Sequence, residues 1–170
     1  MQVDEPLPDL VSERLANRQY DVAFSEWRKA LSRLAGDRDG AITVARSLLE
    51  TTCKIALKEV GATHDKNWDL PKLYYIAATE LGISPTQRTD ELFRSIFGAS
   101  QSIVNRVGEL RNKLGDAHGK GNLDLAVPKH HAELAVNLAG SICCFLVSCL
   151  ESTIAAKKLV TAAIVLDAVG

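Results

Sequence analysis

The stretch from Leu134 to Leu150 constrains the fold more than any other part of the sequence, because it is almost wholly apolar over 17 residues. A helix without a polar face is either the centre of a bundle or a membrane span. The stretch is short for a span, and it contains an asparagine, a glycine and two serines. We therefore expect residues 129–157 to form a long central apolar helix, and we expect no contact with a membrane.

The rest of the sequence is also helical in its pattern. Apolar residues recur every three or four positions in the segments 20–35, 41–60 and 88–114. Asp69 is placed as an N-cap before Leu70 and Pro71, which predicts a further helix that ends near Leu81. No strand-like alternation persists anywhere. The sequence therefore predicts an all-α helical bundle.

The length of 170 residues suits one compact domain. We expect residues 1–19 to form an N-terminal arm with a short helix at about 10–18, since two prolines interrupt the start of the chain. Residues 20–157 then form the helical domain. Residues 158–170 follow as a hydrophobic C-terminal tail.

Composition and charge narrow the possible functions. A net charge of −1 provides no overall field that would draw the protein onto nucleic acid, so any RNA contact must be local. The start of the chain lacks the pattern of a signal peptide, and the four cysteines lack metal-ligand spacing, which predicts a cytoplasmic protein with no metal and no cofactor. We expect those cysteines to be small apolar residues in the core: Cys53, Cys143, Cys144 and Cys149.

The segment from Arg111 to His118 is the strongest candidate for a functional motif. Counting 100° per residue, Arg111 and His118 fall on the same helical face as Val104 and Val107. Charged groups normally occupy the solvated face of such a helix. A guanidinium and an imidazole in phase with apolar residues indicate a cleft, an interface or a partner surface, although basic groups near a helix end also interact favourably with its dipole.

These residues resemble a known family. An Arg, a polar residue, a short spacer and a His at a helix end resemble the active-site motif of the HEPN superfamily. The blocks 40–54, 69–74 and 110–119 are together similar to the abortive-infection C-terminal (Abi-C) domain family, and the resemblance covers roughly residues 20–150. It implies a HEPN-like bundle that acts as a metal-independent endoribonuclease in phage defence or as a toxin.

The resemblance also implies partners. HEPN nucleases pair two domains so that both motifs line one cleft, which implies a homodimer here, with RNA as substrate. A toxin role would add a neutralising protein partner. The alternative function is a catalytically silent helical module that binds RNA or another protein and regulates a defence effector, because a fold by itself does not guarantee activity.

Within the motif, residue chemistry suggests roles. Imidazole exchanges protons near neutral pH, which suits His118, and a guanidinium binds phosphate through a planar fork of donors, which suits Arg111. Asp116 would orient the imidazole and Asn112 would bind the phosphate, although both residue types also favour helix ends. We expect Gly115 to bend or end the helix, so that His118 folds back toward Arg111.

Further basic and acidic residues are candidates for binding RNA or lining the cleft. These are Arg46, Glu50 and Lys54, spaced four apart on the helix at 41–60, and Lys113 in the motif. The alternative for the first three is a solvated row of ion pairs, each contributing a few tenths of a kcal/mol.

Overall fold

The computed structural model describes residues 7–87, 90–119 and 127–167, with the backbone alone for 111–119 and for 166 and 167. Its regular elements are all helical, which confirms the predicted all-α class. Two short 3₁₀ turns accompany the α-helices, at Arg18–Tyr20 and Pro85–Gln87. The α-helices are α1 Leu7–Leu15, α2 Asp21–Arg33, α3 Arg38–Val60, α4 Leu70–Glu80, α5 Glu91–Gly119 and α6 Lys129–Asp167.

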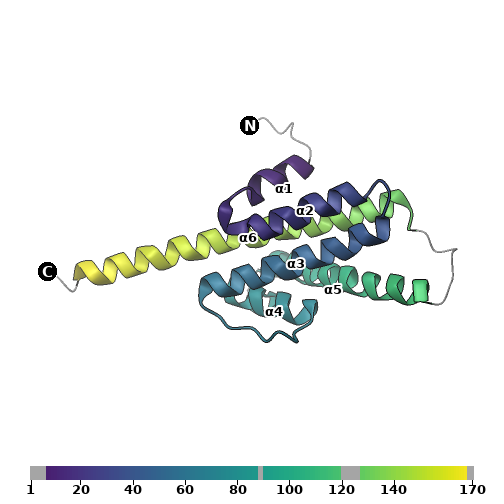
Figure 1. Cartoon of the computed structure of the whole chain (residues 1–170). Helices are drawn as coiled ribbons and strands as arrows, with labels where there is room; N and C mark the ends of the chain where they lie inside the picture. Colours follow the sequence, from purple (N-terminus) through teal and green to yellow (C-terminus); the bar gives the residue numbers. More distant parts are fainter. Residues whose placement is uncertain (1–6, 88–89, 120–126, 168–170) are drawn as a thin grey trace.

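Helix α3 lies at the centre of the bundle. It contacts α2, α4, α5 and α6, and its most extensive contact is with α6. In Figure 1, α1 and α2 lie on one side of this pair, and α4 and α5 lie on the other. The sequence predicted α6 as the central helix, and the structure shows that α3 shares this position. The largest fully buried side chains include Trp27, Tyr20, Leu48, Leu57 and Leu146.

Helix α6 differs from the prediction in two ways. Only one side of it is buried, through residues such as Val136 and Leu146, whereas Leu134 on the other side is 58% exposed. The helix also continues to Asp167 instead of ending near residue 157, and its last part projects beyond the bundle (Figure 1). By length and composition, Lys129–Val165 is the described segment that could cross a membrane, and half of its most apolar window is buried in the bundle.

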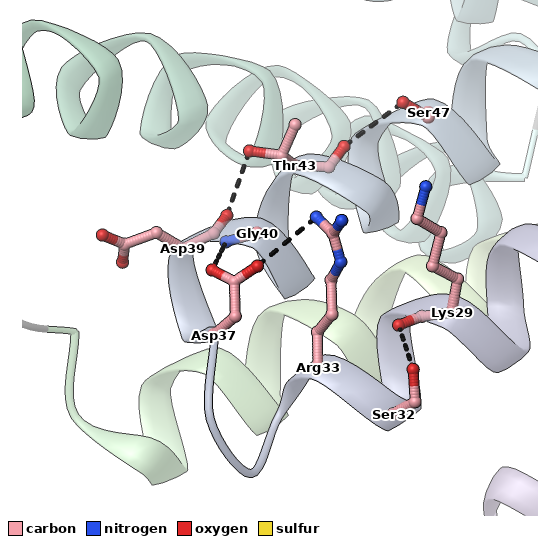
Figure 2. Close-up of polar contacts among 8 residues, drawn as sticks. All are labelled: Lys29, Ser32, Arg33, Asp37, Asp39, Gly40, Thr43 and Ser47. Atoms are coloured by element: carbon pink, nitrogen blue, oxygen red, sulfur yellow. Dashed lines mark hydrogen bonds and ion pairs between the residues drawn. The ribbon is translucent and has the colours of Figure 1, made fainter.

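Local signals set two helix ends as predicted, whereas the short helix expected at 10–18 is α1 at Leu7–Leu15. The Asp69 side chain accepts a hydrogen bond from the backbone nitrogen of Lys72 at 3.0 Å and caps α4. Gly61 ends α3 in the left-handed conformation, with φ of 82°. Helix α3 begins earlier than expected, at Arg38, because Asp37 Oδ1 accepts from the Gly40 nitrogen at 2.9 Å (Figure 2).

The turn between α2 and α3 is tied from both helices. Arg33, on the last turn of α2, reaches across to Asp37 at 3.5 Å, as Figure 2 shows. Thr43 and Ser47 each donate a hydrogen bond to the backbone carbonyl four residues earlier in α3. These contacts hold the first turns of α3 in place. The start of α3 lies at the same end of the bundle as the end of α5 and the start of α6 (Figure 1).

Candidate functional site

The motif lies on an unbroken helix. Helix α5 runs to Gly119, so the prediction that Gly115 bends or ends it is wrong. A glycine inside a helix costs only about 1 kcal/mol relative to alanine, and a helix of 29 residues can bear that cost. The side chains of the motif lie outside the described part of the structure: Arg111, Asn112, Lys113, Asp116 and His118.

The continuous backbone fixes how the two principal residues relate to each other. Seven residues correspond to two helical turns, so Arg111 and His118 share one face with their Cα atoms about 10.5 Å apart along the axis. Val104, one heptad before Arg111, is fully buried, and Val107 is buried beside it. The line of the motif therefore continues a face that α5 packs into the bundle.

Three helices meet just before the motif. Leu110 packs against the buried cluster of Ile42, Ala132 and Ala135, which brings together the start of α3, the end of α5 and the start of α6. The Arg38 guanidinium donates a hydrogen bond to the Val127 carbonyl at 3.2 Å, which ties α3 to the residues before α6. The motif thus begins where the bundle is well packed and extends toward its end.

The predicted cleft-lining residues on α3 lie at increasing distance from the contact between Ile42 and Leu110. Helices α3 and α5 run in opposite directions (Figure 1), so residues after Ile42 and residues after Leu110 move apart. Lys54 lies about 18 Å along α3 from Ile42, and His118 lies about 12 Å along α5 from Leu110, a separation of about 30 Å along the bundle. Arg46 is the residue of this set that α3 holds nearest to Arg111.

The three α3 residues also differ from a fully solvated row. Arg46 Nε lies 2.9 Å from Glu50 Oε1, and the two side chains are only 21% and 26% exposed. Lys54 is half-buried. Charges that are partly withdrawn from water interact more strongly than those on an open surface. The ion pair was predicted from the spacing, and its partial burial was not.

Glu26 on α2 is a candidate functional residue that the sequence analysis did not identify. It is half-buried, and its Oε2 has no hydrogen-bond partner in the described part of the chain. Burial raises the pKa of its carboxyl, the nearby Thr51 hydroxyl partly offsets this, and the Glu50 carboxylate raises the pKa further. Lys54 and Lys29 act in the opposite direction. Glu50 and Lys54 therefore face a polar seam between α2 and α3.

We expect Glu26→Gln to stabilise the fold at neutral pH. The raised pKa means that the folded state disfavours the ionised carboxyl, so this group's contribution to stability is lost as pH rises through the folded-state pKa. The amide carries no charge and avoids this loss. Thermal unfolding should show a higher midpoint than wild type at pH 7, and the difference should vanish below about pH 4, near the ordinary pKa of glutamate. A lower midpoint at pH 7 would contradict this account.

An apolar groove lies between α5 and α6 beside the start of the motif. Its volume is about 570 Å³. Ile103, Val107 and Leu110 line it from α5, and Leu134 and Leu138 line it from α6. His131 lines one end of the groove, and both His130 and His131 are exposed, as the sequence predicted. The described residues that line this groove are mainly apolar.

The cysteines lie where the sequence placed them, in or against the core. Cys53 and Cys143 are buried, Cys144 and Cys149 are half-buried, and all four are free thiols. Burial raises the pKa of the Cys53 thiol to about 12, which leaves it protonated and unreactive at neutral pH. The described residues contain no group of three His, Cys, Asp or Glu side chains that could hold a metal ion.

The regular elements of the described residues are all helices, and Arg111 and His118 lie two turns apart on the long helix α5. The family model of the Abi_C HEPN-like domain matches residues 21–150, and the chain belongs to this family. The match begins at the first residue of α2 and includes the whole motif; α1 and the projecting part of α6 lie outside it. No curated protein and no solved structure matches the chain. Membership in the family relates the protein to abortive infection.

Proposed function

We propose that the protein is a metal-independent endoribonuclease of HEPN type that acts in phage defence or as a toxin in the cytoplasm. One observation carries this proposal: the Arg and His lie inside the family match, on one face of a continuous helix and in phase with the buried Val104. A face that enters the bundle at one end and presents a guanidinium and an imidazole at the other suits a site for a phosphate.

The chemistry follows from these two groups. The ribose 2′-oxygen attacks phosphorus and loses its proton to a base, while the leaving 5′-oxygen gains a proton from an acid. His118 suits either proton transfer, because both forms of imidazole are present near neutral pH. Arg111 holds the phosphate and stabilises the extra negative charge that develops on it. Asp116 would orient the imidazole, and Asn112 would donate to the phosphate.

A second copy would complete the site. One His performs only one of the two proton transfers at a time, and a spacing of about 10.5 Å along the helix is long for two side chains of one copy that share a phosphate. In a homodimer whose motifs face one cleft, the second His supplies the other transfer. The two copies would contribute the same surface to a two-fold interface.

The hold on RNA is local. Lys113 in the motif and Arg46 on α3 would add to the hold of Arg111 on RNA, whereas Lys54 lies far along the bundle. The overall charge of −1 provides no general attraction to RNA, so binding would rest on these local residues. A neutralising protein partner would need to cover only this end of the bundle to block access.

Incubation of the purified protein with total RNA tests the proposal. We expect cleavage that persists in excess chelator and yields 2′,3′-cyclic phosphate ends, because the attacking group is the neighbouring ribose hydroxyl. Loss of cleavage in chelator, restored by magnesium or manganese, would contradict the mechanism. Binding of RNA without any cleavage would instead favour a regulatory module without catalytic activity.

A further inference from the structure

Helix α6 is apolar on every side after it leaves the bundle (Figure 1). We call residues 159–165 the projecting segment, and all of them are exposed. Leu159 is 73% exposed, and the other large apolar side chains are 57% to 63% exposed: Val160, Ile164 and Val165. Counting about 100° per residue from Leu159, these three lie about 100°, 140° and 240° around the helix. Alanines and one threonine occupy the remaining positions.

This distribution decides what kind of surface could cover the segment. A helix that packs against one protein surface needs an apolar stripe on one side only, with polar residues opposite. A helix that is apolar all round is found in the core of a protein or in a membrane. The projecting segment is not in the core. A lipid bilayer, which surrounds a helix on all sides, therefore matches it better than a protein groove does.

The root of the projecting segment is basic. Lys157 Nζ donates a hydrogen bond to the Val60 carbonyl at the end of α3, at 3.2 Å, which ties this part of α6 to the bundle. Lys157 and Lys158 also line a hollow of about 580 Å³, together with Thr161 and Glu59. Two ammonium groups and one carboxylate leave a net positive charge there. Such a charge attracts the phosphates of anionic lipid headgroups.

We propose that the projecting segment inserts into one leaflet of a bilayer that contains anionic lipids, with Lys157 and Lys158 at the level of the headgroups. The uncharged run from Leu159 to Leu166 measures about 12 Å as a helix, whereas the hydrocarbon of a bilayer is about 30 Å thick. The run therefore enters one leaflet and does not cross. Asp167 follows it, and a carboxylate opposes deeper insertion.

The insertion leaves the motif accessible. Measured along α6, His131 lies about 42 Å from Leu159, and α5 finishes at the His131 end of the bundle (Figure 1). A protein held by the projecting segment therefore carries its motif at the far end of α6. The expectation of no membrane contact was based on Leu134–Leu150, which forms part of the bundle, and did not concern the residues after it.

Sedimentation with lipid vesicles tests the insertion. The purified protein should sediment with phosphatidylcholine vesicles that contain about 30% phosphatidylglycerol, and at least about fivefold less with phosphatidylcholine alone. Leu159→Glu should weaken binding at least about tenfold, because a carboxylate is costly in hydrocarbon. Leu92→Glu on α5 is the matched control, since Leu92 is 69% exposed and the variant adds the same charge. It should bind within about twofold of wild type.

The basic root has its own test. Lys158→Ala should weaken binding to the anionic vesicles about fivefold, as expected for one lysine near such a surface. Lys29→Ala, which removes an exposed lysine of α2, should change binding by less than about twofold. Circular dichroism checks that each variant is folded.

Three outcomes would overturn the inference. These are no sedimentation of the wild type with anionic vesicles, equal losses from the two glutamate variants, or equal binding to both kinds of vesicle. Absence of vesicle binding together with a lower mass of Leu159→Glu in light scattering would assign the segment to a protein contact instead. The inference does not depend on RNA cleavage, so vesicle binding by a protein that cleaves no RNA would still support it.

Discussion

His118→Ala is expected to abolish RNA cleavage, with a loss in rate of about 100-fold or more, while the fold and the dimer remain. The size of the loss follows from general acid–base catalysis, in which one positioned group contributes about 10²–10⁴-fold. RNA affinity should change little, because the imidazole is a minor contributor of charge. The measurement is the single-turnover cleavage rate on a fixed RNA, with circular dichroism and light scattering to confirm fold and dimer.

Two matched controls sharpen this prediction. His131→Ala removes an exposed His from the rim of the neighbouring groove and should leave the cleavage rate within about twofold. Arg111→Ala should reduce both cleavage and binding, since the guanidinium holds the phosphate. Arg106→Ala on the same helix removes an exposed side chain that pairs with Glu109 and borders the groove, and it should change both much less. Full cleavage by His118→Ala would exclude the acid–base role.

Helix boundaries could be predicted from sequence where a local signal decides them. Asp69 and Gly61 act through their own backbone and side-chain chemistry, and both ends were found as expected. The prediction at Gly115 was wrong because the low helix propensity of one glycine costs little free energy compared with the stabilisation of the other residues of α5. The end of α6 was also misread: the sequence from Lys158 to Asp167 contains neither Gly nor Pro, and so contains no signal that would stop a helix.

For the candidate site too, features set by local sequence could be predicted and features set by helix packing could not. The shared face of Arg111 and His118 follows from helical periodicity alone, and the family match covers both residues. The distance of Lys54 from the motif depends on the opposite directions of α3 and α5, which no local pattern encodes. The half-buried position of Glu26 likewise depends on how α2 packs against α3, so sequence reasoning had no means to find it.

The second large effect is expected in the core, where Trp27→Ala should lower the free energy of unfolding by about 3–5 kcal/mol. Trp27 is fully buried, and its Nε1 donates to the Ser12 hydroxyl of α1 at 3.1 Å. Its ring lies directly on α6, since a Cβ added at Gly140 would lie 2.7 Å from it. One side chain therefore joins α1, α2 and α6. Urea denaturation measures the loss, and Trp68→Ala, at a half-buried position, should cost clearly less.

Substitution of Gly140 tests the same packing, because the change in stability should reverse sign when Trp27 is removed. With Trp27 in place, Gly140→Ala should destabilise the protein, because the added methyl group collides with a ring that the packed core cannot move. In the Trp27→Ala background the collision with the ring is absent, and the remaining close neighbour, Val11 Cγ2 at 3.2 Å, has the space left by the ring to move into. The same change should then stabilise by up to about 1 kcal/mol through helix propensity. Gly98→Ala, which meets no atom within 4 Å, should stabilise in both backgrounds. If the two substitutions at Trp27 and Gly140 were simply additive, the ring would not rest on α6 as the structure places it.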